Sequence, residues 1–79
     1  MQQDYERLAD ARIRAAEARI DLLKAKADEK KAAAFIELQD RVEEAKRLYQ
    51  QLRNSTTEQY QEIRTRLDAM LTAMERELK

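Results

Sequence analysis

The chain of 79 residues contains no cysteine, histidine, glycine, proline or tryptophan. Without cysteine it has no disulfide framework and no thiolate chemistry, and without histidine it lacks the commonest acid–base group and metal ligand. No apolar run approaches the ~20 residues that span a bilayer. Residues 1–6 lack the basic and apolar regions of a secretory signal, so we expect a cytoplasmic protein.

The charges are balanced, with 16 basic and 16 acidic residues in a chain that is 41% charged. A general nucleic-acid binder carries a basic excess, and the lysines between 24 and 31 are interleaved with Asp28 and Glu29, so no specific nucleic-acid site is expected. Adjacent acids such as Glu43 and Glu44 point in different directions on a helix. Di-metal bundles need Glu-x-x-His motifs. The sequence therefore predicts no enzyme, no cofactor and no metal site.

Ala, Glu, Lys, Leu and Arg dominate, which is typical of long helices and coiled coils. One apolar stripe has a mean step of about 3.6 residues, so it stays on one face of a straight helix. Apart from Lys31, its members are Tyr5, Ala9, Ile13, Ala16, Ile20, Leu23, Ala27, Ala34, Leu38, Val42, Ala45, Tyr49 and Leu52. The pattern predicts a long helix over about residues 4–53, which would measure about 75 Å.

A second apolar row accompanies the first half of this predicted helix. It follows alternating steps of three and four residues, the 3.5-residue period of a coiled-coil seam. Apart from Glu29, which interrupts it, its members are Leu8, Ala11, Ala15, Ala18, Leu22, Ala25, Ala32 and Ile36. A helix with two apolar faces needs neighbours on both sides, although alanine is also simply a good helix former.

The stretch Asn54 to Glu58 is the strongest candidate for a break in a chain without glycine or proline. Ser55 and Glu58 match the capping box S/T-x-x-E, which starts a helix. We therefore expect an all-α single domain over 1–79: a long helix at about 4–53, a break at 54–57 and a short helix at about 57–78, folded as a hairpin within a coiled-coil-like bundle. Because the stripe keeps its phase through Thr56, one continuous helix is the alternative.

In such a hairpin the short arm covers only the second half of the long arm. The bare apolar surface near residues 5–30 then predicts a homo-oligomer. The expected interface residues are Leu8, Ile13, Ile20, Leu22, Leu23 and Ile36. The predicted function is a non-catalytic, self-associating coiled-coil interaction or structural protein, with another protein as a further partner. The alternative is an amphipathic helix protein that binds a lipid surface.

Residues 22–38, with the sequence LLKAKADEKKAAAFIEL, resemble a family of small bacterial coiled-coil proteins that are often described as stress-related. The shared features are an AKAD-type stretch at 25–28, a charged amphipathic helix at 37–53, a short polar break, and a last segment that opens near an aromatic, here Tyr60. The resemblance covers roughly residues 19–74. It implies a small cytoplasmic helical protein linked to stress and carries over no catalytic residue.

Overall fold

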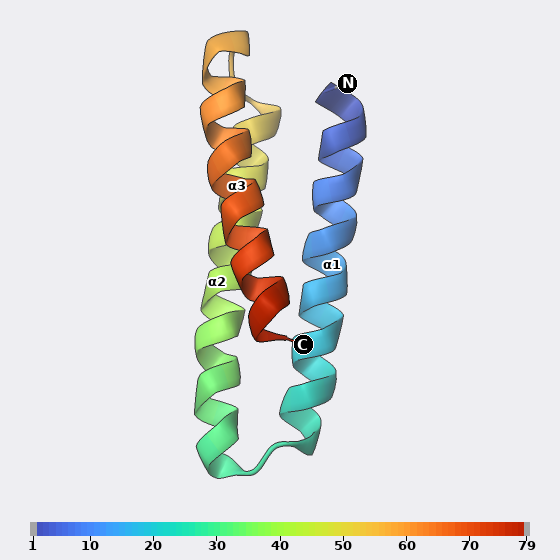
Figure 1. The fold of residues 1–79 in the computed structure, drawn as a ribbon, viewed down its shortest axis with the longest axis vertical. Helices are drawn as coiled ribbons and strands as arrows, with labels where there is room; N and C mark the ends of the chain where they lie inside the picture. Colours follow the sequence, from blue (N-terminus) through green and yellow to red (C-terminus); the bar gives the residue numbers. More distant parts are fainter. Residues whose placement is uncertain (1, 79) are drawn as a thin grey trace.

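The protein is a bundle of three helices in a computed structural model that describes residues 2–78 (Figure 1). The helices are α1 (Gln2–Lys26), α2 (Glu29–Arg53) and α3 (Thr57–Glu77). Each helix contacts both of the others. The all-α prediction and the break before residue 57 are confirmed, and the alternative of one continuous helix is wrong.

The predicted long helix is also wrong, because the chain turns back at Ala27 and Asp28 (Figure 1). Asp28 has an extended backbone (φ −77°, ψ 177°) and caps α2, since its carboxylate accepts a hydrogen bond of 3.0 Å from the backbone N–H of Lys31. The Ala27 N–H donates to the Lys24 carbonyl at 3.2 Å and closes the last turn of α1. The molecule is consequently 45 Å long, far shorter than a continuous helix over 4–53.

The second turn, between α2 and α3, lies where the sequence predicts it, but its cap is displaced by one residue. Thr56 is the N-cap of α3 and its hydroxyl accepts from the Gln59 N–H at 3.4 Å. The Ser55 hydroxyl instead donates to the Leu52 carbonyl at 2.7 Å. Ser55 therefore closes α2 and cannot be the predicted N-cap, while Glu58 lies in the first turn of α3, where its charge suits the helix dipole.

The core is formed by the predicted stripe together with one face of α3. Because α2 runs antiparallel to α1, the two halves of the stripe face each other instead of lying on one long rod (Figure 1). The buried side chains are Tyr5, Ala9, Ile13, Ala16, Ile20, Leu38, Val42, Ala45, Leu52, Tyr60, Leu67, Leu71, Met74 and Leu78. Most of the stripe is thus buried, but its first half is covered by α2 of the same chain and not by a second copy as predicted, and Ala34 stays exposed.

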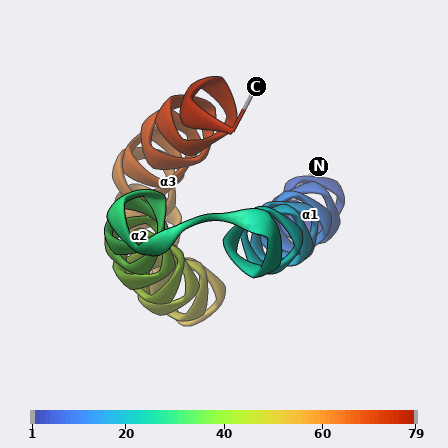
Figure 2. The ribbon, with the colours of Figure 1, turned by 90° about the horizontal axis from the view of Figure 1, so that it is seen from below.

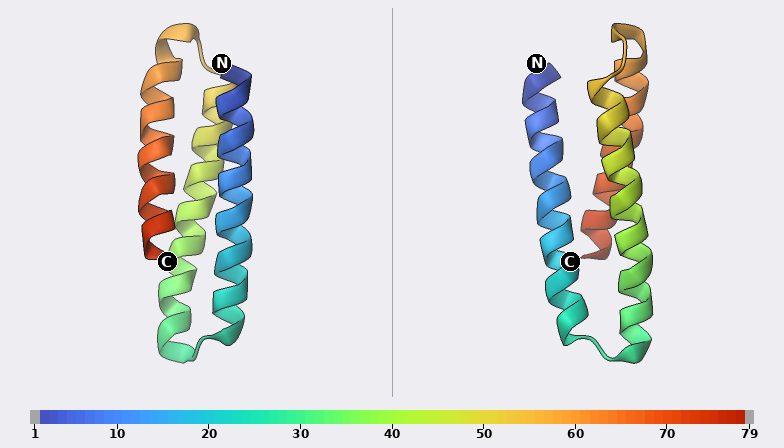
Figure 3. Two further views of the ribbon diagram at one scale, coloured as in Figure 1. Left: turned by 45° about the vertical axis from the view of Figure 1, so that its right-hand side comes forward. Right: turned by 180° about the vertical axis from the view of Figure 1, so that it is seen from behind.

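Helix α3 is shorter than the pair it packs on. Figure 2 looks along the bundle and shows α1 and α3 each beside α2. In Figure 3, α1 and α2 continue past the end of α3 to their own connecting loop. Polar contacts fix the level at which α3 ends, because Glu75 lies beside Arg12 of α1 and Glu77 beside Arg41 of α2. One end of the molecule therefore has three helices and the other has two.

Candidate interaction surface

The outer face of α1 carries an uninterrupted apolar row, here called the outer row, in which every residue is exposed. It consists of Leu8, Ala11, Ala15, Ala18, Leu22 and Ala25. Leu8 and Leu22 are 53% and 47% exposed, which is unusual for leucines in a chain with a formed core. The spacing places these residues at the a and d positions of successive heptads. Helix α1 therefore presents a complete coiled-coil seam that no other part of the described chain covers.

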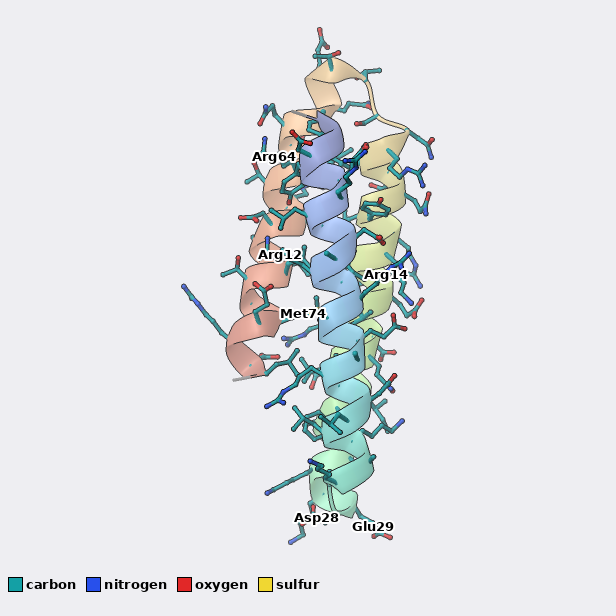
Figure 4. The ribbon with its side chains drawn as sticks, turned by 90° about the vertical axis from the view of Figure 1, so that its right-hand side faces the viewer. Arg12, Arg14, Asp28, Glu29, Arg64 and Met74 are labelled. Atoms are coloured by element: carbon teal, nitrogen blue, oxygen red, sulfur yellow. The ribbon has the colours of Figure 1, made fainter. Side chains whose placement is uncertain are left out.

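The two flanks of the outer row face different helices. In Figure 4, α1 faces the viewer, with Arg12 on the side of α3 and Arg14 on the side of α2. The opposite face of α1, which includes Ile13 and Ile20, packs into the core. Because these two apolar faces lie on different sides of one helix, folding of the single chain can bury only one of them.

The predicted interface residues divide between these faces. Ile13 and Ile20 are 3% and 0% exposed, so their prediction as intersubunit residues fails. The reason is the turn at Asp28, which brings α2 back over them. Leu23 is partly buried against the same core. The remaining residues, Leu8 and Leu22 of the outer row and Ile36 near the start of α2, are the large hydrophobic side chains that stay exposed.

On the α3 side, the outer row is bordered by a polar cluster centred on Arg12. Its guanidinium donates to both oxygens of Glu75 at 2.7 and 3.0 Å, to Asp68 at 2.7 Å and to Thr72 at 3.3 Å. Hydrogen bonding to Glu75 raises the pKa of Arg12, so this side chain remains charged. The cluster joins α1 to α3 and was not predicted, since its members are more than 50 residues apart in sequence.

On the α2 side, the outer row borders a groove between α1 and α2 that is lined mainly by acids. Glu17 and Asp21 come from α1, and Asp40 and Glu43 come from α2. Lys46 bridges the helices by ion pairs of 3.0 Å to Glu17 and 3.4 Å to Glu43. Lys24 also donates to Gln39 of this groove at 3.3 Å, so two lysines face four carboxylates. The groove keeps a negative balance that favours a cationic neighbour.

The tyrosines near the N-terminal end of α1 have a packing role. The Tyr5 hydroxyl donates to the Arg64 carbonyl at 3.4 Å, and the Arg64 guanidinium lies 4.4 Å from the centre of the Tyr5 ring. Tyr60 is buried close by and lines the same surface hollow as Tyr5 and Leu8. Burial raises the pKa of both tyrosines. A tyrosine acting as a base would need a lowered pKa, so this arrangement favours structure over chemistry.

Other kinds of functional site have little support within residues 2–78. No group of acidic side chains there is arranged to hold a metal ion. None of the three helices combines the length and apolar character needed to cross a bilayer. Comparisons of the chain with protein-family models, with curated proteins and with solved structures found no match. The outer row is thus the feature of this fold that most needs an explanation.

Proposed function

We propose that this protein is a non-catalytic interaction or structural module that associates with itself through the outer row of α1. The observation that supports the proposal is the exposure of a whole heptad-spaced apolar row on a helix whose other apolar face is already buried. Exposed apolar surface that is continuous along an element marks interaction sites more often than scattered residues do. Ile36 on α2 is exposed to a similar extent.

The expected affinity is low. Further burial of a half-exposed leucine gains about 1 kcal/mol, and an alanine gains less. Two copies would bury the leucines and alanines of both outer rows, for a total of about 7 kcal/mol. Association costs at least ~4 kcal/mol in lost freedom of motion. At most about 3 kcal/mol remains, which corresponds to a dissociation constant of about 6 mM or weaker, so the association would be weak and reversible.

Sedimentation equilibrium from ~10 μM up to ~5 mM, a range whose upper end approaches this constant, tests the proposal. The wild-type mass should rise with concentration, while the double variant Leu8→Asp/Leu22→Asp should stay monomeric with unchanged helical circular dichroism. Ile36→Asp measures the contribution of α2 separately. A wild-type chain that is monomeric at the highest concentration would refute self-association.

A lipid surface is the second candidate, because basic side chains lie beside the exposed leucines. Arg7 and Arg14 border the outer row on one side and Arg19 borders it on the other, an arrangement that peripheral helices use on anionic membranes. Flotation with vesicles that contain anionic lipid tests this second function. Co-migration of the protein with the vesicles that is lost at high salt would support binding to a lipid surface. A stress-related role and a cytoplasmic location rest on the sequence arguments alone.

A further inference from the structure

We infer that the outer row pairs with the outer row of a second copy in an antiparallel, two-fold symmetric arrangement in which each leucine packs against an alanine. The inference rests on the proposed self-association and specifies its geometry. It follows from the order of large and small residues along the row and from the charges on its flanks.

The order of residue sizes makes the row complementary to itself. Antiparallel helices pack a positions of one helix against d positions of the other. In this row every a position except Ala15 is leucine, and every d position is alanine. When the centre of the row lies on the two-fold axis, the facing pairs are Leu8 with the partner's Ala25, Ala11 with the partner's Leu22, and Ala15 with the partner's Ala18. Large residues opposite small ones interdigitate and allow a close approach of the helix axes, near the lower end of the 8–10 Å range.

The charges on the α2 side agree with this register. Two-fold symmetry keeps the same flank of both copies on one side of the pair, so Arg14 lies near the partner's Asp21. Asp21 belongs to the acidic groove between α1 and α2. Arg14 is 78% exposed and, among the described residues, its ion pair is the 3.2 Å contact with Asp10, so its side chain is accessible to the partner.

On the α3 side, the same register brings the partner's Arg19 towards Arg12. Two like charges would ordinarily repel there. Arg12, however, is held between Asp68 and Glu75 at 2.7 Å each. The partner's Arg19 therefore approaches a guanidinium that is already paired, which weakens the repulsion on this flank.

A parallel pair in register fits the same row poorly. It would place leucine against leucine at positions 8 and 22 and alanine against alanine between them, so the leucines would hold the helices apart where the alanines need close contact. Parallel pairs also bring g positions against e positions of the partner. Arg14 would then face the partner's Arg19, and Asp21 would face the partner's Lys26. Residue sizes thus favour the antiparallel arrangement, which also replaces the contact between Arg14 and Arg19 with one between Arg14 and Asp21.

Disulfide trapping tests the direction, because the natural chain has no cysteine. Leu8→Cys and Ala25→Cys are made as separate single-cysteine variants, one of them carrying a mass tag, and are mixed and oxidised at millimolar concentration. The antiparallel register predicts the mixed disulfide between positions 8 and 25 as the main product. It leaves two copies of residue 8 about 25 Å apart by helical rise, too far for a disulfide.

The paired variants Ala15→Glu and Ala73→Glu test the surface. Both replace an exposed alanine within a helix, but only Ala15 lies in the outer row, at the centre of the predicted pair. Ala15→Glu should weaken association in sedimentation by at least tenfold, and Ala73→Glu should leave it within about twofold of the wild type.

The possible results separate the geometry from self-association itself. Disulfides between like positions, an equal mixture of all pairs, or an Ala15→Glu variant that associates normally would overturn the antiparallel pairing while leaving self-association in place. A wild-type chain without concentration-dependent mass would overturn both.

Discussion

The link between Arg12 and α3 gives a stability prediction whose size can be worked out from the contacts. The side chain is only 19% exposed, and both of its carboxylate partners belong to α3. The two-pronged contact with Glu75 should contribute about 1 kcal/mol, and the more exposed contact with Asp68 about 0.5 kcal/mol. Loss of the packed aliphatic stem adds about 0.5 kcal/mol. Arg12→Ala should therefore destabilise the fold by about 2 kcal/mol, or roughly 8–16 °C in Tm for a chain of this size.

Urea and thermal unfolding at low micromolar concentration, where the chain is expected to be monomeric, measure this effect. Arg14→Ala is the matched control on the same helix, since its 78% exposed side chain has one intrahelical ion pair and should cost only about 0.3 kcal/mol. A double-mutant cycle of Arg12→Ala with Glu75→Ala should give a coupling of about 1 kcal/mol. A coupling near zero, or equal losses for Arg12→Ala and Arg14→Ala, would refute the claim that this cluster holds α3 against α1.

Other predictions concern the helix caps and the buried tyrosines. Asp28→Ala should destabilise the protein by about 1 kcal/mol in chemical unfolding because α2 loses its N-cap, with Asp28→Asn close to wild type; equal losses would argue against a capping role. Thr56→Ala should cost about 1 kcal/mol, and its helical content should fall in α3 by NMR chemical shifts, whereas Ser55→Ala should leave the start of α3 intact. Because burial raises the folded-state pKa of Tyr5 and Tyr60 above the ordinary 10.0, the stability that comes from their neutral rings is complete below pH 10 and declines as pH rises through the raised values. A Tyr5→Phe/Tyr60→Phe variant should lose less stability between pH 9.5 and 11 than the wild type, and parallel pH curves would contradict this.

The periodicity of the sequence was enough to predict an all-α fold and its apolar stripe, and the capping pattern at Ser55 and Glu58 marked the second turn. Alternating steps of three and four residues separate buried from exposed positions on any amphipathic helix, whichever chain covers the buried face. For this reason Ile13 and Ile20 could be recognised as residues that need a partner surface. Periodicity does not say whether that surface comes from the same chain, and the prediction assigned it to a second copy.

The first turn was missed because its residues also suit a continuous helix. Ala27 and Lys31 keep the phase of the stripe, and alanine is the best helix former. The available signal was a change in charge, from Lys24 and Lys26 in the last turn of α1 to Asp28 and Glu29 at the start of α2. Cations favour helix ends and anions favour helix starts. Absence of glycine was a misleading guide, since within residues 2–78 no backbone adopts a positive φ, the conformation for which turns require glycine.

The polar contacts between α1 and α3 could not be predicted in the same way. Arg12 meets Asp68 and Glu75 only after two turns have set the levels of the helices, and each of these residues on its own resembles any solvent-exposed charge. The outer row, by contrast, was visible in the sequence. Its exposure became clear only when the fold showed which of the two apolar faces of α1 the chain itself buries.

The short third helix has a consequence for the order in which the backbone opens. Amides in the last turns of α1 and the first turns of α2 are supported by one neighbouring helix, whereas those around Ile13, Ala45 and Leu71 are enclosed by the full bundle. Local opening needs less free energy where fewer apolar contacts must be broken. In hydrogen exchange, the least protected helical amides should therefore lie around residues 22–36, at the two-helix end of the bundle. These amides should exchange before most amides of α3 do.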